Sequence, residues 1–229
     1  MNFKLRSRIA VEFAGTVFLL MAVVGSSIMA ERLAGGNVAL ALLANSLATG
    51  SVLVALILAL GPISGAHLNP VVTLADAMQG GIAWHEVPGY MAAQVLGAFA
   101  GVAAAHLMFG LPVFFASHHA RGGPALLWSE FIATFGLLAV IWGCARSRTS
   151  AVSFAVGAYI TAAYWFTAST SFANPAVTMA RAASDTFAGI RPIDAPAFIL
   201  VQLAAAIVAT LCFRWLAPAQ VSPATKVKA

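Results

Sequence analysis

Two short segments of nearly identical sequence carry the most regularly spaced polar residues of this chain. Residues 69–77 read Asn-Pro-Val-Val-Thr-Leu-Ala-Asp-Ala and residues 174–182 read Asn-Pro-Ala-Val-Thr-Met-Ala-Arg-Ala, so that six of nine positions agree. An Asn side chain can accept hydrogen bonds from the free N–H groups of a helix start, and Pro is tolerated at the first helical position. Each segment therefore predicts a helix that begins at its Asn, either Asn69 or Asn174.

The composition places these helices in a membrane protein. The 229 residues are 61% hydrophobic and 8% charged, which excludes an ordinary soluble domain. Apolar runs of roughly 20 residues, the length that crosses a bilayer, occur six times; we expect spans at 9–30, 38–60, 88–109, 125–145, 151–170 and 195–216. The helices of the two Asn-Pro segments are too short to span, and in a bilayer they must face protein or a water-filled path. The prediction is an all-α membrane protein with six transmembrane helices and two half-helices.

The duplication extends beyond the Asn-Pro segments. Glu12 begins Glu-Phe-Ala-Gly-Thr-Val-Phe-Leu-Leu in the first span, and Glu130 begins the related Glu-Phe-Ile-Ala-Thr-Phe-Gly-Leu-Leu in the fourth. Gln94 in the third span is likewise matched by Gln202 in the sixth. The chain therefore reads as one ancestral half that occurs twice.

Each half holds three spans, and an odd number of spans turns the second half upside down. We expect a single channel domain over 1–229, with halves at about 1–115 and 120–218 and a cytoplasmic tail at 219–229. In such an inverted 3+3 repeat the two re-entrant half-helices enter from opposite faces and meet near the midplane, with their N-termini facing.

The facing N-termini predict a preference for neutral solutes. Each helix N-terminus carries about half a positive charge. Two of them at about 4 Å repel a cation by roughly 4 kcal/mol at an effective dielectric constant near 20. Because the Asn side chains also offer N–H donors, small uncharged molecules with oxygen acceptors are favoured over cations and proton wires.

The net charge of +5 is interpreted as a topology signal, and no nucleic-acid partner is expected. By the positive-inside rule, eight basic residues against four place both termini in the cytoplasm of a bacterial-type inner membrane. The eight are Lys4, Arg6, Arg8, Arg146, Arg148, Arg214, Lys226 and Lys228, and the four are Arg32, Arg121, Arg181 and Arg191. No cleaved signal peptide is expected. Cys144 and Cys212 are interpreted as a reduced pair, and no metal site or cofactor is expected.

The paired Asn-Pro boxes resemble those of the major intrinsic proteins, the aquaporin and aquaglyceroporin family. The resemblance covers the whole chain: the boxes Asn69-Pro70-Val71 and Asn174-Pro175-Ala176, the segment Ser64-Gly-Ala-His-Leu-Asn69, and the helices of Glu12, Glu130 and Gln94. It implies an α-helical channel, usually a homotetramer with one pore in each subunit. The partners implied are small neutral solutes, water and the lipid bilayer.

The resemblance also implies a selectivity filter on the outer side of the boxes, at fixed distances from the two Asn. Its four positions here are Thr49, Ala162, Ser171 and Val177. At Thr49 similar water channels have Phe and glycerol channels Trp, and at Val177 the family nearly always has Arg. A ring of small and medium residues without the Arg predicts a wide filter with one charge fewer.

Two further positions depart from the family pattern: Val71 stands where Ala is usual, and Thr178 where glycerol facilitators have Asp. The filter resembles that of atypical bacterial aquaglyceroporins of arsenic resistance, which pass arsenite and methylated arsenicals. The resemblance therefore implies glycerol, urea, arsenite or methylated arsenicals as solutes, besides water.

Other polar residues are assigned supporting roles. We expect Glu12 and Glu130 to accept hydrogen bonds from the loops that lead into the half-helices, in preference to a proton relay. His67 is interpreted as a loop brace that contacts the pore rather than a metal ligand. The pair His118-His119 is interpreted as part of a solvated loop, with a metal site or pH sensor as the alternative. Arg181 lies about one helical turn beyond Val177, so we do not expect it to replace the filter Arg directly.

The sequence leaves two other channel or carrier functions open. A water-selective channel is the alternative within the family. A secondary transporter is the alternative outside it, since inverted repeats with broken helices are common there. An intramembrane enzyme has no support, because no nucleophile is paired with a base and no metal-ligand cluster is present.

Overall fold

The computed structural model describes residues 3–147 and 149–216, and these fold into eight α-helices and one 3-10 turn. The long helices are α1 Leu5–Leu33, α2 Val38–Ser64, α4 Val87–Met108, α5 Pro124–Ser147, α6 Val152–Phe166 and α8 Ala195–Leu216. The short helices are α3 Pro70–Gln79 and α7 Pro175–Arg181, and the 3-10 turn is Thr149–Ala151. Six long helices with two short ones confirm the predicted fold class. Arg148, Lys226, Lys228 and the predicted tail 219–229 lie outside the described residues.

The fifth long helix, α6, is shorter than predicted. Within the described residues, five helices are long and apolar enough to cross a membrane, whereas α6 has 15 residues and continues the 3-10 turn that precedes it. Its predicted range of 151–170 is corrected because the backbone becomes extended at Thr167, with φ −111° and ψ 133°. The Thr167 hydroxyl donates to the carbonyl oxygen of Ala163 at 2.6 Å. Residues 168–173 are thereby free to form the loop that enters α7.

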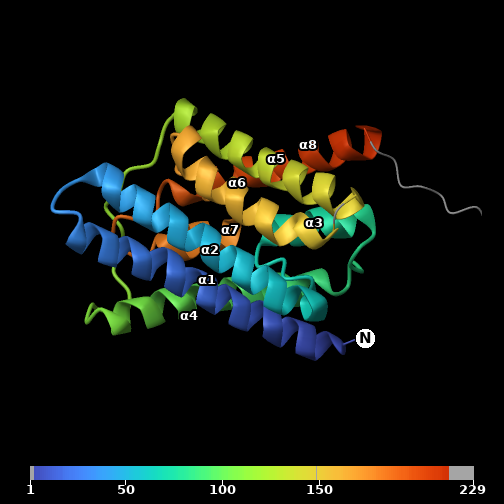
Figure 1. Ribbon diagram of the computed structural model, residues 1–229, viewed down its shortest axis with the longest axis horizontal. Helices are drawn as coiled ribbons and strands as arrows, with labels where there is room; N and C mark the ends of the chain where they lie inside the picture. Colours follow the sequence, from blue (N-terminus) through green and yellow to red (C-terminus); the bar gives the residue numbers. More distant parts are fainter. Residues whose placement is uncertain (1–2, 148, 217–229) are drawn as a thin grey trace, which may run out of the picture.

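The long helices pack as two similar groups joined by α2 and α6. Helix α1 packs against α2 and α4, and α5 packs against α6 and α8 (Figure 1). The two groups meet where Gly50 of α2 faces Gly157 of α6. A Cβ on Gly50 would lie only 2.7 Å from the carbonyl oxygen of Gly157, so the backbones touch as small residues permit. This close contact brings Thr49 beside Tyr164, with 3.2 Å between their hydroxyl oxygens.

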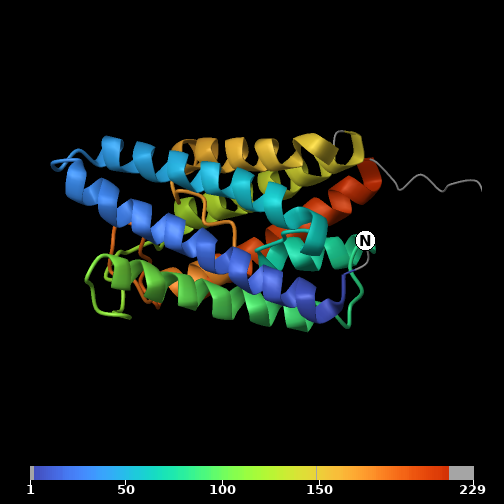
Figure 2. The same ribbon diagram turned by 60° about the horizontal axis from the view of Figure 1, so that its bottom comes forward.

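The two half-helices lie in opposite halves of the molecule. Helix α3 lies toward the end where α1 begins, and α7 lies toward the opposite end (Figures 1 and 2). Helix α8 ends on the same side as the start of α1 (Figure 1). The loops before α3 and α7 bring the starts of the two half-helices to the middle of the bundle, where the candidate site is found.

Candidate functional site: a cavity around two opposed half-helices

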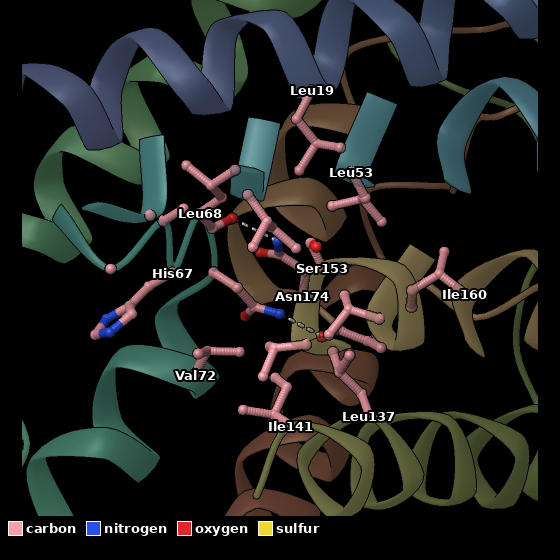
Figure 3. A pocket seen from close by; sticks show the side chains of 18 of the residues that line it. Leu19, Leu53, His67, Leu68, Val72, Leu137, Ile141, Ser153, Ile160 and Asn174 are labelled. Carbon is pink, nitrogen blue, oxygen red and sulfur yellow. Dashed lines mark hydrogen bonds between the residues drawn. The ribbon is translucent and has the colours of Figure 1, made fainter. Parts of the chain in front are cut away.

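The two half-helices start opposite each other and are hydrogen bonded together through their Asn residues. The Asn69 side-chain oxygen accepts from the backbone N–H of Val71 at 3.0 Å, and that of Asn174 accepts from Ala176 at 3.0 Å. Each side-chain nitrogen donates across the junction, from Asn69 to the carbonyl of Ala173 and from Asn174 to that of Leu68, both at 2.8 Å. Figure 3 shows both bonds as dashed lines. Since an Asn amide has two N–H donors, one donor of each Asn is left for a solute.

Glu12 holds the loop before the first half-helix. One carboxylate oxygen accepts from the Ser64 hydroxyl at 2.7 Å and from the His67 backbone N–H at 3.0 Å. The other accepts from the Leu68 N–H at 2.7 Å and from the Gln94 side chain at 2.9 Å. Glu12 is fully buried, and its four bonds provide the loop brace that the sequence predicts.

Glu130 does the same for the second half-helix. Its oxygens accept from the backbone N–H groups of Phe172 at 2.8 Å and Ala173 at 2.9 Å, and from the Gln202 side chain at 2.7 Å. Gln202 also donates to the Thr178 hydroxyl at 2.9 Å. In the first copy Gln94 makes the matching bond to the hydroxyl of Thr73 at 2.9 Å.

These braces hold backbone conformations that non-glycine residues seldom adopt. The φ angles are +47° at Ala66 and +51° at Leu68 in the first loop, and +50° at Ser171 and +46° at Ala173 in the second. Left-handed residues of this kind cost about 1–3 kcal/mol each and persist where the surroundings enforce them. The same strained path in both loops, each anchored to a buried carboxylate, indicates that the position of the Asn pair is enforced by the fold.

A cavity of about 840 Å³ surrounds the Asn pair. It extends from Arg8 near the start of α1, past Asn69 and Asn174, to Thr49 and Tyr164 on the other side. Figure 3 shows that its wall is largely apolar, with Leu53, Val72, Leu137, Ile141 and Ile160 among the side chains around Asn174. An apolar wall with a few placed donors is the usual composition of a small-solute site.

Three of the four predicted filter residues line this cavity. Thr49, Ser171 and Val177 are buried and contact it, at 3%, 3% and 5% exposure. Ala162 does not: its side chain is exposed and lies outside the cavity wall. At about 100° per residue, Ala162 points away from the face of α6 that carries Tyr164. The predicted pore contact of Ala162 is therefore corrected: on this turn of α6 the cavity is lined by Tyr164, whose hydroxyl contacts that of Thr49.

The other box residues pack behind the cavity wall. Pro70 and Pro175 occupy the first helical position of α3 and α7. Val71 and Ala176 are fully buried in hydrophobic clusters and do not line the cavity. Val71 belongs to a cluster with residues of α5 and α8, so its difference from the usual Ala affects packing rather than the pore lining. Thr178 donates to the carbonyl of Asn174 at 2.9 Å and so completes the start of α7.

The last turns of the half-helices carry cavity residues that the sequence reasoning did not assign to the pore. In the first copy His67 Nε2 lies 3.7 Å from a carboxylate oxygen of Asp76. In the second copy the guanidinium of Arg181 lies over the Phe172 ring, 3.4 Å from its centre. All four line the cavity. The signal was present in the repeat, since His67 corresponds to Phe172 and Asp76 to Arg181 when the two Asn are aligned.

His67 also has the predicted brace contacts. Its ring Nδ1 lies 3.1 Å from the Thr73 hydroxyl, and its backbone N–H donates to Glu12. In the loop between α4 and α5, His118 is 89% exposed and bonded at 2.8 Å to Asp185, in the loop between α7 and α8. No group of three metal-ligating side chains is found within the part of the chain that the structure describes. Cys144 and Cys212 are free thiols, both partly exposed.

A multi-pass membrane protein in which two half-helices meet end to end inside a cavity has the construction of a pore. Comparison with known proteins gives the family. Residues 2–152 match the family model for the major intrinsic proteins, and the chain belongs to this family of channels.

Similar proteins agree with this placement. The chain is 52% identical to aquaglyceroporin AqpS of Rhizobium meliloti (strain 1021), over 94% of this chain and 92% of that protein. It is 37% identical to aquaporin NIP1-3 of Oryza sativa subsp. japonica, over 75% of this chain and 62% of that one. The X-ray structure of the aquaglyceroporin from Plasmodium falciparum matches with a TM-score of 0.72 at 23% identity, over 93% of this chain and 95% of that one, which supports the fold.

Proposed function

We propose that this protein is a passive channel for small neutral solutes, namely glycerol, urea, arsenite or methylated arsenicals, together with water. The observation that carries the proposal is the reciprocal pair of bonds by which Asn69 and Asn174 join two helix N-termini inside the cavity. The positive helix ends disfavour cations, and the remaining Asn donors suit hydroxyl and carbonyl oxygens.

The proposed filter consists of Thr49, Tyr164, Ser171 and Val177. Thr49 and Tyr164 share one hydrogen bond, and the Ser171 hydroxyl has no partner among the described residues, which leaves it available to a solute. Thr49, Ser171 and Val177 are small or medium and none of the four is Arg, whereas Tyr164 is a large aromatic side chain; a solute larger than water is therefore expected to pass beside the three smaller residues. The relative named as an aquaglyceroporin supports the same solute class.

The proposed setting is a homotetramer in a bacterial-type inner membrane, with both termini cytoplasmic. Large apolar side chains such as Phe18, Leu47, Trp128, Phe154 and Leu200 are exposed on the long helices, as expected of surfaces that face lipid or neighbouring subunits. Mass measurement of the purified protein in detergent tests the subunit number, and labelling of single cysteines placed in the loops tests the orientation.

The test of function is a panel of solutes in proteoliposomes followed by stopped-flow light scattering. Vesicles with the protein are expected to take up glycerol and urea faster than empty vesicles, and direct arsenic determination extends the panel to arsenite and methylated arsenicals. Acceleration of water alone would replace the proposal with a water-selective channel. No acceleration of any solute would contradict both.

A further inference from the structure

Arg181 is a buried cation for which the fold provides little compensation. It ends α7, is 2% exposed and lines the cavity. Its Nε–H donates to the carbonyl of Ala188, which is the one hydrogen bond found for the Arg181 side chain within residues 3–147 and 149–216. No carboxylate of these residues lies within ion-pair distance of it, although the cost of burying an unpaired charge is high. Its two Nη groups therefore need water or a solute in the cavity.

Arg121 provides an internal comparison, because it also lies against Phe172, with its guanidinium 5.0 Å from the ring centre. Its side chain donates to the carbonyls of Gly189, Ser169 and Phe187 and to the hydroxyl of Thr170, at 2.7–3.4 Å. Arg121 is thus committed to holding the outer loops and does not line the cavity. Of these two arginines, only Arg181 keeps donors and charge for the contents of the cavity.

The position of Arg181 explains how a positive charge can line the cavity without narrowing it at residue 177. Val177 and Arg181 are one helical turn apart, about 6 Å along α7, and both line the cavity. The guanidinium is held on the face of Phe172, in the loop that Glu130 braces. A small side chain thus remains at 177, while a positive charge lies farther from the Asn pair.

We propose that Arg181 sets the charge selectivity of the outer end of the channel: it excludes cations, protons included, and its Nη groups donate to the oxygens of neutral solutes. This inference rests on the proposed channel function and adds a specificity-determining residue to it. Phe172 and the carbonyl of Ala188 act as positioning groups, because the ring and the acceptor oxygen fix the guanidinium of Arg181.

The experiment measures glycerol flux and proton flux in the same proteoliposomes, with light scattering for the first and an enclosed pH dye under an imposed membrane potential for the second. Wild-type protein is expected to conduct glycerol with no proton flux above empty vesicles. Arg181→Met and Arg181→Gln, which remove the charge, are expected to raise proton flux by about 10- to 100-fold over that of vesicles with the wild-type protein. Arg181→Lys, which keeps the charge, is expected to stay near wild type.

Arg191→Met is the matched control, because Arg191 is an outer-loop arginine paired with Asp194 and lies outside the cavity wall. It is expected to change neither flux. Unchanged proton flux in a glycerol-conducting Arg181→Met or Arg181→Gln protein overturns the inference. If neither variant folds, the measurements on the wild-type protein decide. A wild type that conducts both glycerol and protons overturns the inference about Arg181 but not the proposed function, and a wild type that conducts glycerol and excludes protons supports the inference. Absence of glycerol flux in the wild type overturns the proposed function instead.

Discussion

The two copies of the half-helix unit are the same where they hold the backbone and different where their last turns line the cavity. In both, a buried Glu binds the loop, a Gln links that Glu to a Thr, and an Asn begins the helix and reaches across to the other copy. At the last turn the copies diverge, because the first carries Asp76 beside His67 and the second carries Arg181 over Phe172.

This difference separates two kinds of constraint. The shared residues must enforce left-handed backbone and opposed helix starts, so either copy fails if they change. The divergent residues lie at the two ends of the cavity, and Asp76 and Arg181 carry opposite charges. Selectivity is therefore expected to depend on which copy is altered, whereas folding is expected to depend on both equally.

The largest expected effect comes from the two braces. Glu12→Gln or Glu130→Gln replaces an acceptor-only carboxylate by an amide whose NH₂ faces backbone N–H donors. Each is expected to lower stability by about 3 kcal/mol or more, since several charge-assisted bonds are lost together. Thermal unfolding in detergent, followed by tryptophan fluorescence, measures this. Glu31→Gln, at an exposed carboxylate, is the control. A strong loss of stability in only one of the two copies would contradict the expectation that folding depends on both equally.

The Asn pair is expected to give the next largest effect. Asn69→Asp and Asn174→Asp keep a good helix cap but lose the donor that joins the copies. A carboxylate about 4 Å from the pore axis also attracts a cation by roughly 4 kcal/mol at a dielectric constant near 20. We expect glycerol flux to fall about tenfold and proton flux to rise in both variants. Asn37→Asp, at the cap of α2, is the control; glycerol flux at the wild-type rate in either pore variant would exclude the Asn pair from the pathway.

Val177 and its counterpart Val72 test whether the second copy limits the size of the solute. Val177→Arg narrows the proposed filter, and we expect glycerol flux to fall about tenfold, with water flux less affected. Val177→Leu is expected to slow glycerol, whereas the same change at Val72 is expected to have little effect. Stopped-flow rates for water and glycerol measure both. If Val177→Arg leaves glycerol and arsenite uptake unchanged, Val177 does not line the filter.

Variants of Tyr164 and Ala162 test which residue of α6 contributes to the filter. Tyr164→Phe removes the hydroxyl that Thr49 contacts, and we expect glycerol flux to fall by up to about fivefold, the equivalent of one net hydrogen bond. Ala162→Leu, on the exposed face of the same helix, is expected to leave every flux at wild type. If Ala162→Leu lowers glycerol flux and Tyr164→Phe does not, Ala162 and not Tyr164 belongs to the filter.

The smallest expected effect is on the loops that follow α4 and α7. Hydrogen bonds from the backbone and side chain of His118 lower the pKa of Asp185. A carboxylate whose pKa is lowered by folding stabilises the protein above its unfolded pKa of about 3.9 and loses this contribution as pH falls through the lower folded value. The wild type is therefore expected to lose slightly more stability than Asp185→Asn when acidified below about pH 4. Parallel unfolding curves for the two proteins would contradict this.

The sequence predicts those parts of the site that are repeated. Asn69 and Asn174 cap their helices, and Glu12 and Glu130 bind the loops, because duplicated local patterns specify duplicated local structure. The prediction that Ala162 contacts the pore is wrong, because it counts a fixed number of residues back from Asn174. Such a count does not account for where α6 ends, and this helix stops at Phe166. The cavity role of Arg181 was missed because it depends on Phe172 and Ala188, which lie close to it only in the folded loop.

The most direct test of the central claim is the dependence of glycerol entry on its gradient in proteoliposomes. A passive channel for neutral solutes predicts a rate that rises linearly with the glycerol gradient and is unchanged when proton and sodium gradients are collapsed. It also predicts that Asn69→Asp and Asn174→Asp reduce this rate alike. A rate that saturates and requires an ion gradient would contradict the account and indicate a transporter.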